Sequence, residues 1–219
     1  MKKKNINTVL KSLLDTSGEN NVKLIELEGG TFRNNLFGIT FNFPEDWFVV
    51  NREQLIELVE NQLMVGEYEH LKEKLEFENQ PSIIITKYDP SSDKYFGLIS
   101  PTINFSIIPK HPDYLGYSLI EYADLIDSGM AFGYHPLKNF EVLKKGAIWT
   151  IDNYDAVNYE TQYLFEHQDI DFGITVQMQV INIDYGDFFL DFGLTDCAGQ
   201  NQKESEVFKS LIKSIQLSD

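Results

Sequence analysis

The sequence predicts an α+β fold in which an antiparallel β-sheet is flanked by helices. Three long segments with alternating apolar and polar residues follow one another near the C-terminus, at 154–167, 172–183 and 187–196. Their connections are short enough for hairpins, which join antiparallel strands directly. Helical patterns lie before and after this run of strands instead of between successive strands, which favours α+β over βαβ units.

The remaining elements follow from apolar spacing and from turn residues. Helices are expected near the N-terminus, where Ile6, Val9, Leu10, Leu13 and Leu14 repeat at helical spacing, and at 51–78, 118–130 and 203–214. Shorter strands are expected at 22–27, 37–43, 82–88, 102–109, 140–145 and 147–152.

Two local signals fix the ends of these elements. Pro44 stops strand 37–43, and Ser118 with Glu121 three residues later forms a capping box at the start of helix 118–130. The chain has no internal repeat or linker, so we expect a single domain over residues 1–219. Within it, 1–30 is a helix and strand extension and 51–80 is a helical insertion.

We also expect one core. Its members are taken from the apolar positions of the strands and of the last helix: Ile39, Phe41, Trp47, Ile107, Val176, Met178, Leu190, Phe192 and Leu211.

Composition limits the function and the compartment. Lys and Arg number 18 against 34 Asp and Glu, and this net charge of −16 repels nucleic-acid phosphates. The lone Cys197 cannot form an internal disulfide. No apolar run approaches the roughly 18–20 residues of a membrane span, and residues 1–18 lack the apolar run of a secretion signal. The sequence therefore predicts a cytoplasmic protein that binds neither nucleic acid nor membrane.

Several segments resemble the PsbP/Mog-like superfamily, and the chain is similar to a bacterial member of it. These are GITFNFPEDWFV (38–49), INFSIIPKHPDYLGYSLIEYADL (103–125), NYDAVNYETQY (153–163), YGDFFLDFGLTDCA (185–198) and ESEVFKSLIKSIQL (204–217). In the third segment, Asn153 and Tyr154 stand where the superfamily usually has glycine. The resemblance implies an α/β/α sandwich around an antiparallel sheet. It carries over no catalytic motif, because the superfamily has none in common.

No pattern typical of a catalytic, cofactor or metal site is present. The four histidines are scattered, without the spacing of zinc ligands, and no glycine-rich phosphate loop occurs. Cys197 has no basic neighbour that would lower its pKa. The alternative to a binding protein is a carboxylate-based or metal-dependent hydrolase, for which Glu160 and Asp191 could face each other.

One acidic stretch suggests a partner. Residues 146–202 contain ten acids and neither Lys nor Arg. Alternation along the strands of this stretch places six side chains on one face, with no cation to neutralise it: Glu160, Gln162, Gln177, Gln179, Phe189 and Asp191. The acids could simply keep the sheet soluble. They could also form a docking face for a protein with a basic surface, with Phe189 as its apolar anchor. A toxin-neutralising (immunity) protein and a chaperone or adaptor are two concrete forms of this second hypothesis.

Overall fold

The computed structural model describes residues 24–50, 82–92, 99–110, 117–127, 137–168, 170–197 and 202–218. Every strand pair among them is antiparallel. The chain divides into two compact units, one of Met1–Glu45 with Ser210–Asp219 and one of Asp46–Lys209. The boundary falls within helix α5 (Gln202–Ser214), and each unit is described by itself.

The first unit contains a four-stranded sheet in the order β1-β2-β3-β12. Its strands are β1 (Ile25–Glu28), β2 (Thr31–Asn34), β3 (Ile39–Asn42) and β12 (Gln216–Leu217). Phe32 and Phe41 lie directly opposite each other on β2 and β3, and their buried rings stack with centroids 4.7 Å apart. Gly30 has a φ of +69°, and a Cβ there would lie 2.5 Å from the carbonyl oxygen of Phe43, so the turn before β2 requires glycine.

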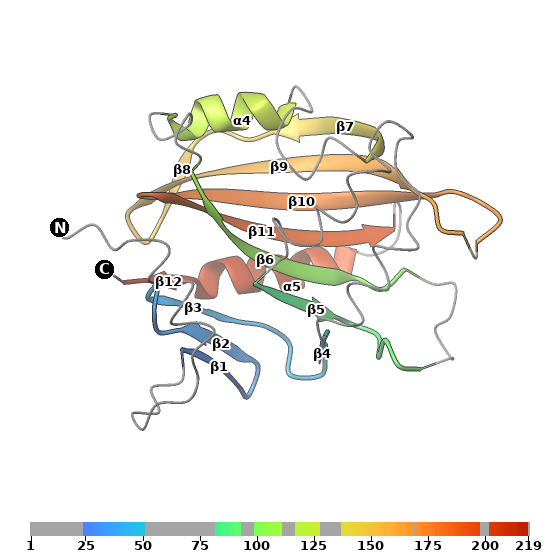
Figure 1. The fold of residues 1–219 in the computed structure, drawn as a ribbon, viewed down its shortest axis with the longest axis horizontal. Helices are drawn as coiled ribbons and strands as arrows, with labels where there is room; N and C mark the ends of the chain where they lie inside the picture. The colour runs from blue at the N-terminus through green and yellow to red at the C-terminus, as the bar shows by residue number, and fades with distance from the viewer. Residues whose placement is uncertain are drawn as a thin grey trace. The chain divides into compact units, whose positions relative to one another are not determined.

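The second unit contains a larger sheet in the order β4-β5-β6-β11-β10-β9-β7, with β8 also paired to β9. Its strands are β4 (Phe48–Val49), β5 (Ile83–Thr86), β6 (Thr102–Pro109), β7 (Lys138–Lys145), β8 (Trp149–Ile151), β9 (Tyr154–Phe165), β10 (Ile174–Tyr185) and β11 (Phe188–Cys197). The three longest strands, β9, β10 and β11, run side by side through its middle (Figure 1).

Helix α4 (Leu119–Asp127) packs on one face of these long strands. The expected capping box starts it: the Ser118 amide donates to Glu121 Oε2 at 2.7 Å, and the Glu121 amide donates to Ser118 Oγ at 3.3 Å. The buried residues beneath α4 form one cluster with it, made of Leu119, Tyr122, Ala123, Val157, Tyr159, Val180 and Phe189.

The opposite face of the same strands is also apolar in its central part. Cross-strand neighbours Ile183, Leu190 and Ile107 form one row, and Ile181, Phe192 and Phe105 form the next. A sheet with one dry and one wet face, as the alternation suggested, is therefore wrong for β11. Because both faces are packed, apolar residues on β11 do not identify which face is buried.

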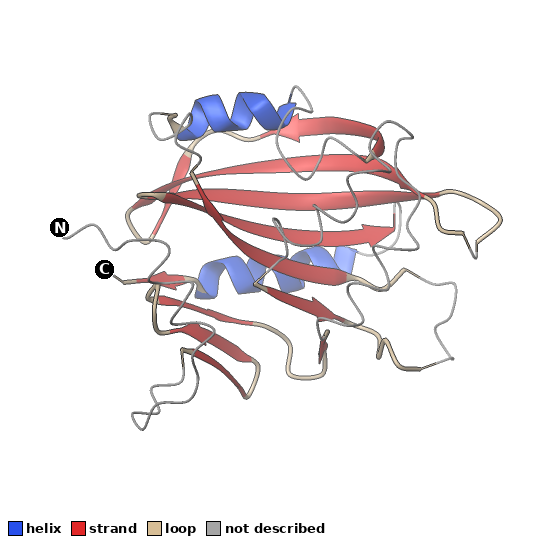
Figure 2. Cartoon of the chain, viewed as in Figure 1, coloured by secondary structure: helices blue, strands red, loops and turns tan. Residues whose placement is uncertain are grey.

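The described part of the chain is thus mostly antiparallel sheet with two short helices, which confirms the predicted antiparallel sheet (Figure 2). The larger sheet is open, and the described residues do not form a clear α/β/α sandwich. The sequence did not predict the short strands β2, β4 and β12. Seven of the nine expected core side chains are buried, in both units, and Ile107 and Met178 are half-buried. The N-terminal helix and the 51–80 insertion lie outside the described residues, and the single domain stays a prediction.

Candidate binding surface and the buried acid pair

Four of the six predicted site residues share one face of the sheet. Gln177 on β10 lies between Gln162 on β9 and Asp196 on β11, and Gln179 lies between Glu160 and Leu194. Residues directly opposite on neighbouring strands point to the same face. These two rows therefore bring Glu160, Gln162, Gln177 and Gln179 together, as predicted, and add Asp196.

Phe189 and Asp191 do not belong to this face. Asp191 is paired with Asn182 and Phe189 with Asp184, so both point to the side that α4 covers. Phe189 is only 1% exposed, and its ring stacks on Tyr122 with centroids 4.0 Å apart. The prediction failed because the β10–β11 hairpin turns through just Gly186 and Asp187, which pairs even-numbered residues of β10 with odd-numbered residues of β11.

The proposed pair of carboxylates is not formed. Glu160 lies in the row with Leu194, and Asp191 is three residues from Leu194 on the same strand, so Glu160 and Asp191 lie on opposite faces. A hydrolase could therefore not use these two residues as a facing pair, and the hydrolase alternative otherwise stays a prediction. The expectation that no cation neutralises the face is also wrong, because Lys144 Nζ on β7 lies 3.3 Å from Glu160 Oε1.

We call the five residues Glu160, Gln162, Gln177, Gln179 and Asp196 the polar patch. The side chain of Glu160 is about half exposed, at 49%. Gln162 Nε2 donates to Glu141 Oε2 at 2.9 Å, and Gln179 Nε2 donates to Ser205 Oγ at 3.0 Å on α5. The patch therefore extends from strand β7 to the start of α5.

A small pocket of about 100 Å³ opens on the polar patch. Its lining includes four patch residues, Glu160, Gln177, Gln179 and Asp196, together with Ser205 and the exposed Leu143. Small-molecule sites usually measure about 300–1,000 Å³. The pocket is therefore too small to enclose a typical substrate, although it can hold a few water molecules or one side-chain head group.

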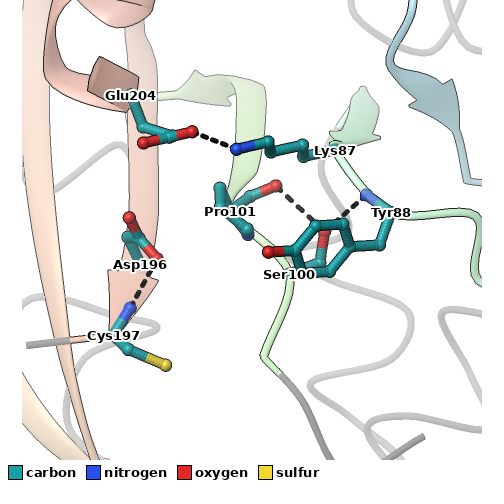
Figure 3. A network of polar contacts seen from close by, with 7 residues as sticks. All are labelled: Lys87, Tyr88, Ser100, Pro101, Asp196, Cys197 and Glu204. Carbon is teal, nitrogen blue, oxygen red and sulfur yellow. Dashed lines mark hydrogen bonds and ion pairs between the residues drawn. The ribbon is translucent and has the colours of Figure 1, made fainter. Parts of the chain in front are cut away.

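Asp196 also belongs to a network of polar contacts in which Glu204 is buried and Lys87 and Asp196 are half-buried (Figure 3). In this network Lys87 Nζ forms an ion pair with Glu204 Oε1 in the first turn of α5. The hydrogen bond to Glu204 raises the pKa of Lys87, and burial opposes this shift. Burial raises the pKa of Asp196, and the charge of Glu204 raises it further. The backbone amide of Cys197 donates to Asp196 Oδ1 at 2.7 Å.

The sequence missed Asp196 as a site residue because the expected alternation placed it on the apolar face. The two-residue turn at Gly186 and Asp187 was the signal that could have found it. Among the described residues, no three His, Cys, Asp or Glu side chains gather as a metal site would require. Burial raises the pKa of the Cys197 thiol, which keeps it protonated.

No helix within the described ranges is long and apolar enough to span a membrane. No protein-family model matches the sequence, and no curated protein sequence matches it significantly.

Solved structures give weak likenesses. Cyanobacterial PsbP (CyanoP) from Synechocystis matches with a TM-score of 0.48 at 12% identity, over 94% of this chain and 99% of that protein. PA94, a Pseudomonas aeruginosa protein of unknown function, matches with 0.46 at 16% identity over 64% of this chain and 85% of its own. LpqN, involved in cell envelope biogenesis of Mycobacterium tuberculosis, matches with 0.43 at 12% identity over 83% of each chain. The protein is similar to these chains, but TM-scores this low support no conclusion about its activity.

Proposed function

We propose that this chain is a non-enzymatic, cytoplasmic protein-binding domain of the PsbP/Mog-like α/β/α type, and that its polar patch docks a protein with a basic surface. The observation that supports this most is the composition of the patch. The exposed carboxylate of Glu160 and the amides of Gln177 and Gln179 line a pocket too small for a typical substrate, together with Asp196 and the exposed Leu143. Carboxylate and amide oxygens accept hydrogen bonds from Lys and Arg, and an apolar side chain beside them supplies a desolvated contact.

Charge over the whole chain supports the same proposal. A net charge of −16 attracts a basic partner over a distance of about one Debye length, roughly 8–10 Å at physiological salt. Leu143 takes the place of Phe189 as the apolar anchor, since Phe189 lies beneath α4. An immunity protein that neutralises a basic toxin, or a chaperone or adaptor for one, is the concrete form of this function.

Binding to the products of the genes that flank this one tests the proposal. Each product is purified and its association with the full chain is followed by stopped-flow fluorescence at low and high salt. We expect Glu160→Lys to lower the association rate constant of the partner about tenfold at low ionic strength, because reversed charge opposes steering. The difference should shrink near 1 M salt, where the Debye length falls to about 3 Å.

The matched control is Asp187→Lys, which makes the same change of net charge at an exposed turn outside the patch. We expect it to slow association less than about threefold. If both variants slow association equally, net charge alone is responsible and the patch is not the docking site. If no flanking product binds, the immunity and chaperone forms of the proposal are wrong.

A further inference from the structure

The carboxyl groups of Glu204, which is buried, and of Asp196, which is half-buried, point toward each other between β11 and α5 (Figure 3). Glu204 is only 2% exposed, and its Oε1 receives the ammonium of Lys87. Its Oε2 is buried and has no hydrogen-bond partner among the described residues. Asp196 Oδ1 accepts the amide of Cys197, whereas Asp196 Oδ2 is buried and likewise lacks a partner in the described part of the chain.

This arrangement is unfavourable if both groups are ionised. An ionised carboxylate only accepts hydrogen bonds, so neither free oxygen can satisfy the other. Two negative charges then have one ammonium between them, and an uncompensated buried charge is costly. Both free oxygens are shielded from solvent, so bulk water does not compensate for them. A proton bound to one of the two free oxygens removes this cost, because it converts one of the two acceptors into a donor.

We propose that Asp196 and Glu204 share one proton, which forms an O–H···O hydrogen bond between strand β11 and the first turn of α5. The proton comes from solvent as the chain folds, and no other group is needed. It resides mainly on Asp196, because the charge of Glu204 is already compensated by Lys87. This inference goes beyond the proposed function, and its test needs no partner protein.

The surrounding groups favour this assignment. Burial, then the charge of Glu204, raises the pKa of Asp196, whereas the Cys197 amide and the Lys87 ammonium lower it. Among the described residues, the other titratable groups close to the pair are Tyr88 beside Lys87 and the Cys197 thiol, whose own pKa burial raises. Across the sheet the neighbour of Asp196 is the neutral amide of Gln177.

The shared proton also affects the pocket. Ser205 follows Glu204 on α5 and is hydrogen bonded to Gln179 at 3.0 Å, so the start of α5 forms one wall of the pocket. While the proton is held, β11 and α5 are joined at this wall. When it is lost, two like charges lie together, and the first turn of α5 is released from β11.

Titration of the intact wild-type protein by NMR tests the proposal directly. We expect the carboxyl ¹³C resonances of Asp196 and Glu204 to change together over a shared pH interval, since coupled groups titrate as a pair. A strongly downfield proton resonance should be present at low pH and disappear over the same interval. If the two resonances change over separate intervals and no such proton is seen, the proposal is overturned.

The variant Asp196→Asn gives a second, independent measurement. Its amide can donate to Glu204 Oε2 at every pH, and its carbonyl can still accept from the Cys197 amide. A raised pKa in the folded state means that wild-type stability falls as pH rises through that pKa. We therefore expect the variant to raise Tm by roughly 2–4 °C over wild type at pH 8, and the difference to vanish near pH 4.

The matched control is Asp187→Asn, which removes the same charge from an exposed turn and should change Tm little at either pH. Amide exchange at Ser205, corrected for its intrinsic pH dependence, should accelerate above the transition in wild type and not in Asp196→Asn. A Tm below that of wild type at both pH values, or a gain equal to that of the control, contradicts the shared proton.

Discussion

Lys110 is a charged side chain that the second unit holds almost out of solvent. Its side chain is 5% exposed, its Nζ lies 2.6 Å from Asp184 Oδ1, and the same ammonium lies 4.4 Å from the centre of the Phe189 ring. Phe189 in turn stacks on Tyr122 of α4. One lysine therefore connects an ion pair to a cation–π contact and an aromatic stack, which together explain why Phe189 is inside.

Removing the carboxylate partner of Lys110 should be costly. We expect Asp184→Asn to lower the free energy of unfolding by about 2 kcal/mol, because it leaves a buried ammonium without its counter-charge. The cost should stay below the roughly 3–5 kcal/mol of a fully buried pair, since the Asp184 side chain is 27% exposed. Urea unfolding at pH 7 measures it.

The ion pair between Lys144 and Glu160 provides the control, since both of its side chains are exposed. Glu160→Gln removes that pair and should change the free energy of unfolding by less than about 0.5 kcal/mol. If the two variants lower the free energy of unfolding equally, burial does not make the ion pair of Lys110 and Asp184 more stabilising than an exposed pair.

At this scale the sequence predicted the types of the site residues better than their positions. Glu160, Gln162, Gln177 and Gln179 share a face because β9 and β10 pair as alternation suggested. Phe189 and Asp191 were misplaced, and Asp196 missed, because β11 is apolar on both faces. Only the register imposed by the turn at Gly186 determines which side chains of β11 face which side. The sequence also could not predict that Asp196 and Glu204 lie close together, because they belong to different elements, β11 and α5.

The hairpin between β8 and β9 depends on two residues with positive φ. Asp152 has a φ of 47° and Asn153 a φ of 72°, as the first and second residues of a two-residue turn. Such turns need φ above zero at both central positions, which glycine adopts freely and Asn or Asp tolerates. Asn153 thus adopts a backbone conformation that glycine would adopt without strain.

Substitution at Asn153 tests this interpretation of the hairpin. Asn153→Gly should raise the free energy of unfolding by about 0.5 kcal/mol, because glycine adopts the left-handed conformation without strain. Asn153→Val should lower it by about 1–2 kcal/mol, because a β-branched residue is strained there. The same two changes at Asn158, which lies within β9, should show no gain with glycine. Chemical denaturation of the four variants measures the differences.

Long elements were predictable and short ones were not. Strand β6 has the predicted bounds, and the capping box at Ser118 starts α4. Strands β2, β4 and β12 have two to four residues each, too few for a periodic pattern. They exist because a neighbouring strand offers hydrogen bonds, which is a property of the folded chain.

At the scale of the whole molecule, the N-terminal strands and the last strand belong to the same compact unit. Leu217 on β12 pairs with Ile39 on β3, and Ser218 donates its amide to Gly38 at 2.9 Å. Residues almost at opposite ends of the chain therefore complete one sheet. This long-range closure has no local sequence signal, and it explains why the helix before β12 was predicted but β12 was not.

Two adjacent residues of β12 allow a test of how this unit is stabilised. Leu217 is 8% exposed, whereas Gln216 is exposed. We expect Leu217→Ala to lower the free energy of unfolding of the first unit by about 2–3 kcal/mol, through lost burial and the cavity left behind. Gln216→Ala, one residue away, should change it by less than about 0.5 kcal/mol.

Hydrogen exchange resolves the effect of Leu217→Ala by unit. The amides of Phe32 and Phe41 report on the first unit, and those of Val180 and Phe192 on the second. If the units open separately, the substitution accelerates exchange at Phe32 and Phe41 roughly 30–150-fold and leaves Val180 and Phe192 unchanged, because local opening reports local stability. Equal acceleration at all four amides would show instead that the chain opens as one cooperative unit, as a single domain over residues 1–219 requires.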